Sequence, residues 1–393
     1  MTRSCDIAVI GLGTMGSFAS CELARRGLHV IGFDHFVPPH GRGSHSGDTR
    51  AFRIAYAEHP DYVPLALRAS ELWDQYSSLC KTQLLTRSGM LSVGPPKSRF
   101  IKGILDSAAL HRLDVIQHTP DEIQRTFPAF ALDEGHIGVF EPKAGWIDAN
   151  GAIKASLRLA EMFGATLRLG DSVLQWAREG DHFEVKTASG IVAAEKLVIT
   201  AGAWTVQLLQ RLGLPLQVQR KVLTWVDPID AALFRPGAFP VFAFGEEFLY
   251  GFPAISEQGV KLSVHWKRGE AVSNPNEPVS EANLDDAAEP LAIAAKLLPR
   301  LAGPLPQSLR RVKQMKTCLY VMSPDEHFLV DRHPEWPGVV FAAGFSGHGF
   351  KFAPAIGEVL ADLATLGAPK LPTGFLGLSR LASKTTVSRQ SVP

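Results

Sequence analysis

Three glycines near the N-terminus have the spacing of a dinucleotide-binding motif. Gly11, Gly13 and Gly16 follow an apolar run at residues 7–11 and open a segment with a helical pattern. In such a motif the first glycine permits a tight turn, the second lets a pyrophosphate approach the backbone, and the third lets the helix pack closely on the strand. The start of the helix offers free N–H groups and a partial positive charge to the phosphates. This context predicts a dinucleotide-binding βαβ unit.

A carboxylate stands at the end of the second strand of this unit. Asp34 closes the apolar run at residues 28–34, 23 residues after Gly11. At this position a carboxylate can accept hydrogen bonds from the ribose hydroxyls of a dinucleotide. The motif does not distinguish NAD from FAD, and a tight glycine turn in an α/β domain without a cofactor remains an alternative interpretation.

A second set of polar residues lies on one predicted strand. Lys261, Ser263 and His265 alternate with the apolar residues Val260 and Leu262. Because side chains of a strand alternate between its faces, the three polar side chains share one face. That face could be functional, or it could be an ordinary polar outer face, and the pattern alone fits both.

Strand and helix patterns alternate in the parts of the chain around the glycine motif. Such alternation predicts a parallel sheet with helices over its faces. Beyond the first βαβ unit we expect helices at about residues 66–76, 151–163 and 352–366, and strands at residues 165–169, 182–187, 196–200 and 339–343.

The remaining segments have a different character. Residues 86–146 mix short strand and helix patterns, and residues 216–324 are mostly β, with strands expected at 217–226, 248–252 and 260–266 and an Ala-rich helix at 282–298. The simplest architecture is a mixed α/β fold in which a mainly antiparallel substrate-binding domain is inserted into a Rossmann-like domain. We predict the Rossmann-like domain at 1–85, 147–215 and 325–393, and the inserted domain at 86–146 and 216–324. The Ser-, Thr- and Lys-rich C-terminal end is expected to be poorly ordered.

Composition limits the possible partners and locations. The chain has 393 residues, with 46% hydrophobic and 20% charged residues, as in ordinary globular proteins. A formal net charge of +1 gives no reason to expect nucleic acid or an anionic membrane as a partner. Apolar runs are too short for a membrane span, and a strand pattern begins by Asp6, which leaves no room for a signal peptide. The spacing of the four cysteines fits neither a metal site nor a disulfide framework, so we expect no metal and a cytoplasmic location.

Several blocks along nearly the full length resemble one family of flavoenzymes. The blocks occur in the same order as in the monomeric sarcosine oxidases, amine-oxidising flavoenzymes that are related to N-methyltryptophan oxidase. They are GSHSGDTR at 43–50, YGFP at 250–253, KLSVH at 261–265, TCLY at 317–320, PDEHF at 324–328 and GFSGHGFKF at 344–352.

The resemblance implies that the cofactor is FAD and that it is covalently bound. The matching cysteine of the family bonds to the 8α carbon of FAD, so Cys318 is the expected attachment residue, as an 8α-S-cysteinyl linkage. A thioether raises the flavin potential and prevents cofactor loss, and nearby cations such as Lys316 would favour the thiolate. Cys5 and Cys21 are expected in the core, and Cys80 has no visible partner. The residues expected to contact the cofactor are Gly11, Gly13, Thr14, Met15, Gly16, Asp34, Ser44, Thr49, Arg50, Val173, Ala201, Gly202, Cys318, Gly344, Gly347, Gly349, Phe350 and Lys351.

The resemblance also assigns roles to cations and aromatic residues. An amino-acid substrate brings a carboxylate, and Arg53 and Lys351 match the family residues that bind it. Lys261 matches the cation that stabilises superoxide when reduced flavin reacts with O₂, with Arg50 near the same flavin region. The residues expected to line the substrate pocket and orient the amine are Tyr250, His265 and Tyr320.

The chain departs from the family pattern at three places. Ser46 follows His45 where the family usually has a second histidine, and Ile54 stands two residues before Tyr56 in place of another histidine. The segment 236–249, which should form a pocket wall, is shorter than expected. Either the reaction does not need the two missing rings, or its reactivity and pH profile differ from those of the family. The short segment leaves the size of the substrate open.

The leading hypothesis is an oxidase of N-methyl amino acids that acts as a monomer. Sarcosine, O₂ and water would give glycine, formaldehyde and hydrogen peroxide. A bulkier or cyclic secondary amino acid, such as N-methyltryptophan, pipecolate or proline, is an alternative. A flavin dehydrogenase that passes electrons to a quinone or protein is another, and the fold alone would also permit a non-catalytic or NAD-binding protein.

Overall fold

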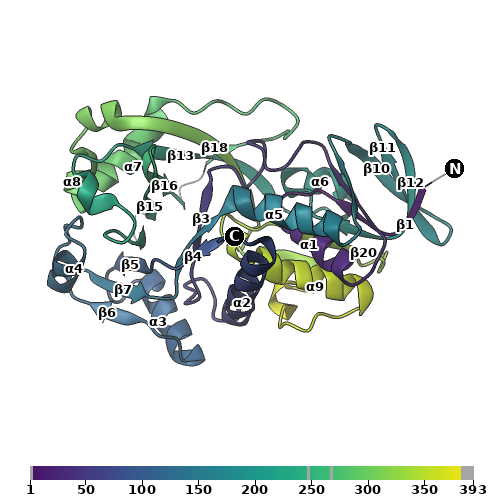
Figure 1. Cartoon of the computed structure of the whole chain (residues 1–393), viewed down its shortest axis with the longest axis horizontal. Helices are drawn as coiled ribbons and strands as arrows, with labels where there is room; N and C mark the ends of the chain where they lie inside the picture. Colours follow the sequence, from purple (N-terminus) through teal and green to yellow (C-terminus); the bar gives the residue numbers. More distant parts are fainter. Residues whose placement is uncertain (1–2, 246–247, 266–268, 382–393) are drawn as a thin grey trace, which may run out of the picture.

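The computed structural model describes residues 3–245, 248–265 and 269–381 (Figure 1). The first of two large sheets contains five strands that are joined by parallel pairings: β1 (Arg3–Ile10), β2 (Val30–Asp34), β9 (Thr166–Leu169), β12 (Gly190–Ile199) and β20 (Val339–Ala343). Antiparallel strands extend it at the edges: β10 (Val173–Glu179), β11 (His182–Thr187) and β19 (Leu329–Arg332). The centre of this sheet is therefore the parallel layer that the alternating pattern predicts.

Helices cover one face of this sheet. They are α1 (Thr14–Arg25), α2 (Tyr62–Cys80), α5 (Ala149–Met162) and α9 (Ala353–Thr365). Ile7 and Val9 of β1 belong to the apolar core that these helices form, whereas Ala8 and Ile10 belong to a core on the other face. Because both faces are covered, the strand reads as a continuous apolar run.

The second large sheet is mainly antiparallel. It runs in the order β17, β13, β16, β15, β14, β5, β7, β6, with β18 on the other edge of β13, and only the β14–β5 pair of this sheet is parallel among the described residues. Its strands are β5 (Met90–Gly94), β6 (Ile116–His118), β7 (Ile137–Glu141), β13 (Gln217–Val226), β14 (Val241–Phe244), β15 (Leu249–Ser256), β16 (Gly259–Val264), β17 (Glu270–Ala271) and β18 (Val312–Met322). The helices of this region are α3 (Arg99–His111), α4 (Pro120–Thr126), α7 (Leu284–Leu297) and α8 (Pro299–Ala302).

A small third sheet connects these parts. It consists of β3 (Thr49–Phe52), β4 (Leu85–Thr86) and β8 (Gly145–Asp148). Lys261 of β16 donates hydrogen bonds to Thr49 of β3, and β3 also contacts the 3₁₀ turn Phe350–Phe352 that precedes α9. The strand β3 therefore joins the second sheet to the entrance of a helix of the first.

The predicted fold class is confirmed. The expected helices at 66–76, 151–163, 282–298 and 352–366 correspond to α2, α5, α7 and α9, and the observed α2 is longer at both ends. The division into two domains stays a prediction, although strands from 90–141 and 217–322 do share one sheet. The expectation for the C-terminal end falls mostly on residues 382–393, which lie outside the described residues.

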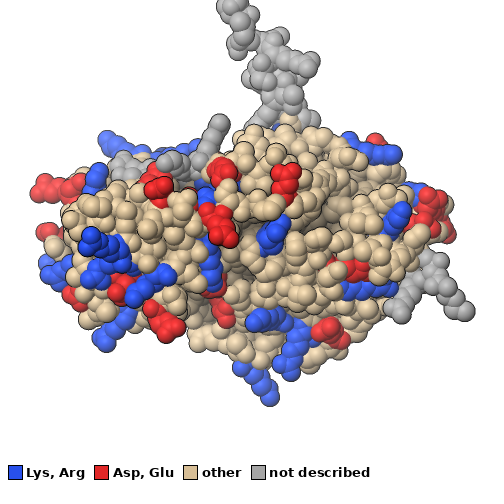
Figure 2. All heavy atoms as spheres, turned by 90° about the horizontal axis from the view of Figure 1, so that it is seen from above, with Lys and Arg blue, Asp and Glu red and all other residues tan. Residues whose placement is uncertain are grey.

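Charges of both signs are mixed over the face of the molecule in Figure 2. This distribution agrees with a formal net charge of +1 and presents a mixed surface rather than a field of one sign. Within the described residues, none of the helices combines the length and the hydrophobicity that crossing a bilayer requires.

Candidate active site

A cavity of about 410 Å³ lies at the carboxyl ends of β1, β2 and β20. The loop between β1 and α1 lines it, together with the end of β2, the segment around residues 43–50, part of β18 and the turn after β20. Ligands of parallel α/β sheets bind at this edge, because the loops that follow the strands meet there. The cavity is the place where a dinucleotide would bind.

The three glycines of the motif have distinct surroundings. Gly11 has φ +90°, and a Cβ atom there would lie 2.7 Å from the carbonyl oxygen of Thr200. A Cβ atom on Gly16 would lie 1.8 Å from the carbonyl oxygen of Gly11. At Gly13, by contrast, the ring of His45 supplies all the described atoms that a Cβ atom would meet within 4 Å, the nearest at 3.6 Å. The turn therefore has no room for a side chain at Gly11 and Gly16, where the helix packs on the strand. It has free space at Gly13, where a pyrophosphate would approach the backbone.

Asp34 fixes the turn to the end of β2. Its Oδ2 accepts a hydrogen bond of 2.8 Å from the backbone N–H of Leu12, and its Oδ1 accepts one of 2.8 Å from that of Phe36. A carboxylate has about four acceptor positions, so these bonds leave capacity for a ribose hydroxyl. Asp34 also lines the cavity.

Lys261 is buried on β16, with 2% of its surface exposed. Its Nζ donates to the carbonyl oxygens of Gly47 at 2.9 Å and Thr49 at 2.8 Å, and to the Thr49 hydroxyl. Burial, with a smaller contribution from the charge of Arg50, holds the pKa of Lys261 well below its usual value. The interpretation as a solvated outer face is therefore wrong for this residue.

Cys318 is buried beside a guanidinium group. Its Sγ lies 3.6 Å from Nη2 of Arg50 and 3.4 Å from the carbonyl oxygen of Ser44. Burial raises the pKa of the Cys318 thiol, and the charges of Arg50 and Lys261 act in the opposite direction. Lys316, which the sequence suggested as an assisting cation, instead forms an ion pair of 2.8 Å with Asp48.

Arg50 is held by the loop that precedes it. Its guanidinium donates to the carbonyl oxygens of Thr49 and Ser44 at 2.8 Å each and of Ser46 at 2.5 Å. The side chain lines the cavity and lies 5.8 Å from the ring centre of Phe350. The cation is thus fixed by backbone oxygens at the wall of the cavity.

Tyr250, His265 and Tyr320 form one aromatic cluster. The hydroxyl oxygens of Tyr250 and Tyr320 are 3.5 Å apart, and Nδ1 of His265 lies 3.4 Å from the Tyr320 hydroxyl. Burial lowers the pKa of His265 to about 3, so the ring is neutral at physiological pH. A Cβ atom on Gly347 would lie 2.1 Å from the Tyr320 ring, which shows how closely the turn after β20 packs on this cluster.

Two cations share a third aromatic ring. The guanidinium carbon of Arg53 lies 4.1 Å from the ring centre of Tyr56, and Nζ of Lys351 lies 5.3 Å from the same centre. Lys351 donates to the carbonyl oxygen of His348 at 2.7 Å, and Arg53 donates to both oxygens of Glu58 at 2.5 and 2.8 Å. The structure thus brings Arg53 and Lys351 to the same ring, while their predicted role toward a substrate carboxylate stays a prediction. Sequence reasoning missed Glu58.

The protonation of this group follows from burial and pairing. Burial, with the charge of Arg53, holds the pKa of Lys351 well below its usual value. Burial opposes ionisation of Glu58, but the charge of Arg53, its hydrogen bonds and the charges of other nearby groups together outweigh burial and lower the pKa of that carboxyl group. Glu58 is therefore an internal counterion, and another carboxylate must compete with it for Arg53.

Most of the predicted cofactor residues do line the cavity. Four of them are not among the residues that line it: Gly16, Thr49, Cys318 and Lys351. The same holds for the predicted substrate residues Arg53, Tyr250 and His265 and for Lys261. Their functional roles stay predictions. The predicted residues on the lining are Gly11, Gly13, Thr14, Met15, Asp34, Ser44, Arg50, Val173, Ala201, Gly202, Tyr320, Gly344, Gly347, Gly349 and Phe350.

Sequence reasoning missed an aromatic group at one part of the lining. Trp204 lies 5.8 Å from Phe36 and 6.4 Å from His35 between ring centres, and its Nε1 donates to Oδ1 of Asn276 at 2.7 Å. His35 and Phe36 directly follow Asp34, so their position was a usable signal. Asn276 is remote in sequence, and no local pattern marks it.

The two positions where the family pattern has a histidine, Ser46 and Ile54, have different environments. Ser46 is 7% exposed, and its carbonyl oxygen accepts a hydrogen bond from Arg50. Ile54 is 4% exposed and belongs to the apolar core with Tyr56, while its backbone N–H donates to Glu141 at 2.7 Å. An apolar side chain thus fills the space where the family pattern has a titratable ring.

Comparison with known proteins identifies the class. Residues 6–363 match the family described as FAD dependent oxidoreductase, and the chain belongs to this family. It is 36% identical to a monomeric sarcosine oxidase of Streptomyces avermitilis, over 98% of this chain and 99% of the relative. It is 34% identical to the monomeric sarcosine oxidase of Bacillus sp. (strain B-0618), over the whole of both chains, and 34% identical to N-methyl-L-tryptophan oxidase of Salmonella typhimurium, over 96% and 99%. The resemblance that the sequence blocks carry is confirmed.

Solved structures support the fold. The amino acid oxidase NikD of nikkomycin biosynthesis superimposes with a TM-score of 0.81 at 23% identity, over 96% of this chain and 98% of that one. L-proline dehydrogenase from P. horikoshii gives a TM-score of 0.82 at 23% identity, over 98% and 99%. At this level of identity the similarity concerns the fold alone.

The residues present fit FAD. The glycine turn is open at Gly13, the carboxylate of Asp34 has free acceptor capacity, and Arg50 and the turn at 344–349 line the rest of the cavity. The open turn would accept the pyrophosphate of FAD and Asp34 a ribose. The part of the cavity at Arg50 and the turn 344–349 would accept the isoalloxazine ring.

Replacement of Gly16 tests this fit. Because the new methyl group would overlap the carbonyl oxygen of Gly11, we expect Gly16→Ala to lower the bound flavin roughly tenfold, which corresponds to about 1.4 kcal/mol. The measurement is flavin absorbance per protein after purification. Gly41→Ala is the control, because no described atom lies within 4 Å of its added Cβ atom. Full flavin content in Gly16→Ala would contradict the placement of the cofactor.

Proposed function

We propose that the protein is an oxidase of N-methyl amino acids, with sarcosine as the preferred substrate. Sarcosine, O₂ and water give glycine, formaldehyde and hydrogen peroxide. The observation that carries the proposal is the pair of buried cations, Arg53 and Lys351, on the ring of Tyr56. Lys351 directly follows Phe350, which lines the cofactor cavity. A buried cation pair suits a substrate carboxylate, and relatives at 34–36% identity are named sarcosine oxidases.

The substrate carboxylate would take the place of Glu58 on Arg53. Arg53 offers a planar fork that already grips one carboxylate through both of its oxygens. Lys351 adds a point charge with further donor capacity, since an ammonium has three N–H groups. Exchange of one carboxylate for another keeps the buried charge of Arg53 compensated, so binding need not expose an unpaired ion.

The aromatic cluster would orient the amine. Tyr250 and Tyr320 present hydroxyl groups, and the neutral ring of His265 adds no positive charge that would repel or compete with the amine. FAD, when bound, accepts the hydride equivalents from the C–H bond next to the nitrogen. The chain's own contribution is to hold that C–H bond toward the cofactor and to keep water out.

Cys318 would hold the cofactor covalently through the 8α carbon of FAD. The sulfur is buried 3.6 Å from Arg50, with Lys261 as a second cation that favours the thiolate. The reactive form of a cysteine is the thiolate, and nearby cations lower the free energy needed to form it. The neighbouring residues of its strand, Leu319, Tyr320 and Val321, line the cavity directly.

The mass of the intact protein tests this attachment. We expect the denatured wild-type protein to carry one added flavin mass and Cys318→Ser to carry none. Cys21→Ser is the matched control, because Cys21 is also buried but lies in α1. An unmodified mass for the wild-type protein, or a flavin mass that persists in Cys318→Ser, would contradict the assignment.

Lys261 would promote the reaction of the reduced cofactor with O₂. A fixed cation beside the flavin stabilises the superoxide that the first electron transfer forms. Lys261 is fixed in this way by Gly47 and Thr49. This role separates an oxidase from a dehydrogenase that uses another electron acceptor.

Peroxide release and flavin reoxidation test the function together. We expect peroxide with sarcosine, and we expect Lys261→Met to slow reoxidation roughly 10³-fold while flavin reduction stays within about twofold. Lys196→Met is the control, because Lys196 also donates to a backbone carbonyl, but that carbonyl belongs to Ala364 of α9 and not to the segment at Gly47 and Thr49.

Three outcomes have distinct meanings. Peroxide only with N-methyltryptophan, pipecolate or proline would assign a bulkier or cyclic substrate. Unchanged oxygen kinetics in Lys261→Met would favour the dehydrogenase. If no secondary amino acid leads to peroxide release, the proposed function is wrong.

We also propose that the enzyme acts as a monomer in the cytoplasm. The relatives named monomeric sarcosine oxidase match over their full length. The four cysteines are free thiols, as is usual in a reducing compartment.

A further inference from the structure

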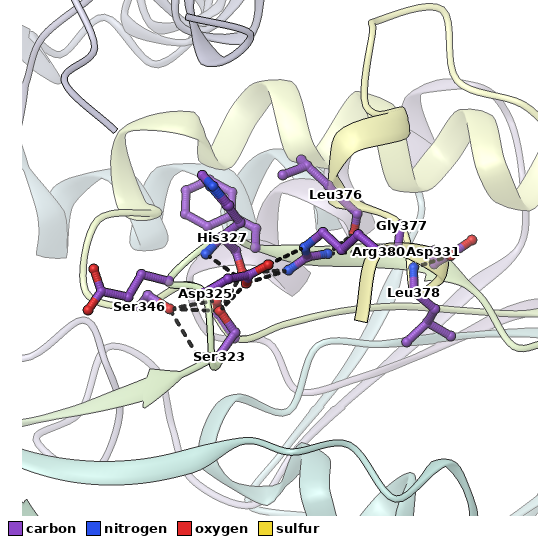
Figure 3. A network of polar contacts seen from close by, with 12 residues as sticks. Ser323, Asp325, His327, Asp331, Ser346, Leu376, Gly377, Leu378 and Arg380 are labelled. Carbon is purple, nitrogen blue, oxygen red and sulfur yellow. Dashed lines mark hydrogen bonds and ion pairs between the residues drawn. The ribbon is translucent and has the colours of Figure 1, made fainter. Parts of the chain in front are cut away.

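The last described residues dock onto the loop between β18 and β19. Arg380 donates from Nε to Oδ2 of Asp325 at 3.1 Å and from Nη2 to Oδ1 at 3.3 Å (Figure 3). The same guanidinium donates to the carbonyl oxygens of His327 at 2.8 Å, Leu376 at 2.8 Å and Gly377 at 3.0 Å. The side chains of Arg380 and Asp325 are 15% and 6% exposed. A pair that is so little exposed, with this many hydrogen bonds, fixes the loop more firmly than a surface ion pair does.

This loop is bonded to the turn that faces the cofactor cavity. Asp325 accepts from the Ser323 hydroxyl at 3.3 Å, and the backbone N–H of Ser323 donates to Oγ of Ser346 at 3.1 Å. The backbone N–H of Ser346 donates to the carbonyl oxygen of Val321 at 2.9 Å. Ser346 has φ +46° and Glu326 has φ +62°, left-handed conformations that cost energy outside glycine and need support from their surroundings. The network in Figure 3 provides that support.

His348 links this loop to the proposed substrate site by hydrogen bonds. Its Nε2 bonds to the carbonyl oxygen of Glu326 at 2.9 Å, and its Nδ1 bonds to the Tyr56 hydroxyl at 2.7 Å. Its own carbonyl oxygen accepts from Lys351 at 2.7 Å. The loop therefore fixes the position of the His348 ring through the carbonyl oxygen of Glu326. His348 in turn fixes the positions of the Tyr56 hydroxyl and the Lys351 ammonium group through its own hydrogen bonds.

The C-terminal segment also contacts the residues next to Glu58. Phe375 stacks on His59 with ring centres 5.7 Å apart and forms a T-shaped contact with Tyr62, with ring centres 4.9 Å apart. The Tyr62 hydroxyl lies 3.2 Å from Nδ1 of His327, so the same loop is reached from this side as well. Both parts of the proposed carboxylate site are thus braced by residues 375–380.

We propose that Arg380 is a positioning residue for the substrate carboxylate site: through Asp325 it holds the loop at 323–327, and this loop fixes Ser346, His348 and thereby Lys351. The inference rests on the proposed function in one respect, the role of Lys351 toward the substrate. Lys261 is held by a different segment, at Gly47 and Thr49, so the reaction with O₂ should not depend on Arg380.

The test compares Arg380→Ala with Arg380→Lys and with a matched control. Arg68→Ala breaks another bidentate ion pair, with Glu358 at 2.7 and 2.8 Å, without touching the loop. We expect Arg380→Ala to raise KM for sarcosine about tenfold while flavin reoxidation keeps its wild-type rate, and Arg380→Lys to recover part of the loss. Backbone amides of residues 344–352 should exchange hydrogen faster in Arg380→Ala than in Arg68→Ala.

The outcomes separate this inference from the proposed function. Wild-type protein that oxidises no secondary amino acid would end the proposed function, whereas hydrogen exchange would still decide the coupling of Arg380 to residues 344–352. A wild-type KM with unchanged exchange in Arg380→Ala, or equal changes in Arg68→Ala, overturns the inference. Should Arg380→Ala not accumulate, Asp325→Asn replaces it. We again expect a raised KM for sarcosine and an unchanged rate of flavin reoxidation.

Discussion

Buried positive charge around one cavity is the constraint on which the structure depends. Arg50, Lys261 and Lys351 are held by backbone carbonyl oxygens, while Arg53 is paired with the carboxylate of Glu58, whose side chain is 12% exposed. Isolated buried cations are costly, and burial accordingly lowers the pKa of both lysines. Carbonyl dipoles reduce that cost without neutralising the charge. The site therefore suits anionic groups such as the substrate carboxylate and the superoxide of the proposed function.

Each of the two large sheets positions a part of these groups. The parallel sheet ends in the glycine turn and in the turn after β20, which line the cavity from one side. The second sheet contributes the long β13–β18 pair, which places Lys221 opposite Cys318, and β16, which carries Lys261. The strand β3 lies between them and carries Arg50, with Arg53 just beyond its end. Rigid strands, rather than loops alone, thus fix the spacing of the cations.

Local patterns predicted what depends on local geometry. The motif at Gly11–Gly16 was readable because a tight turn needs glycine wherever it occurs. The face of Lys261 was not readable, because a period of two fits an inward and an outward polar face alike, and burial by β3 decides between them. Glu58 and Arg380 escaped notice for a further reason: their partners, Arg53 and Asp325, are chosen by tertiary packing, and no spacing along the chain marks them.

The central claim is that one buried lysine, Lys351, binds a carboxylate and the other, Lys261, does not. Titration of the flavin-loaded protein with acetate, followed by the flavin absorption spectrum, tests it most directly. The account predicts saturable binding that Lys351→Met weakens about tenfold and that Lys261→Met leaves within about twofold of the wild type. Equal weakening by both replacements, or none by Lys351→Met, would contradict it.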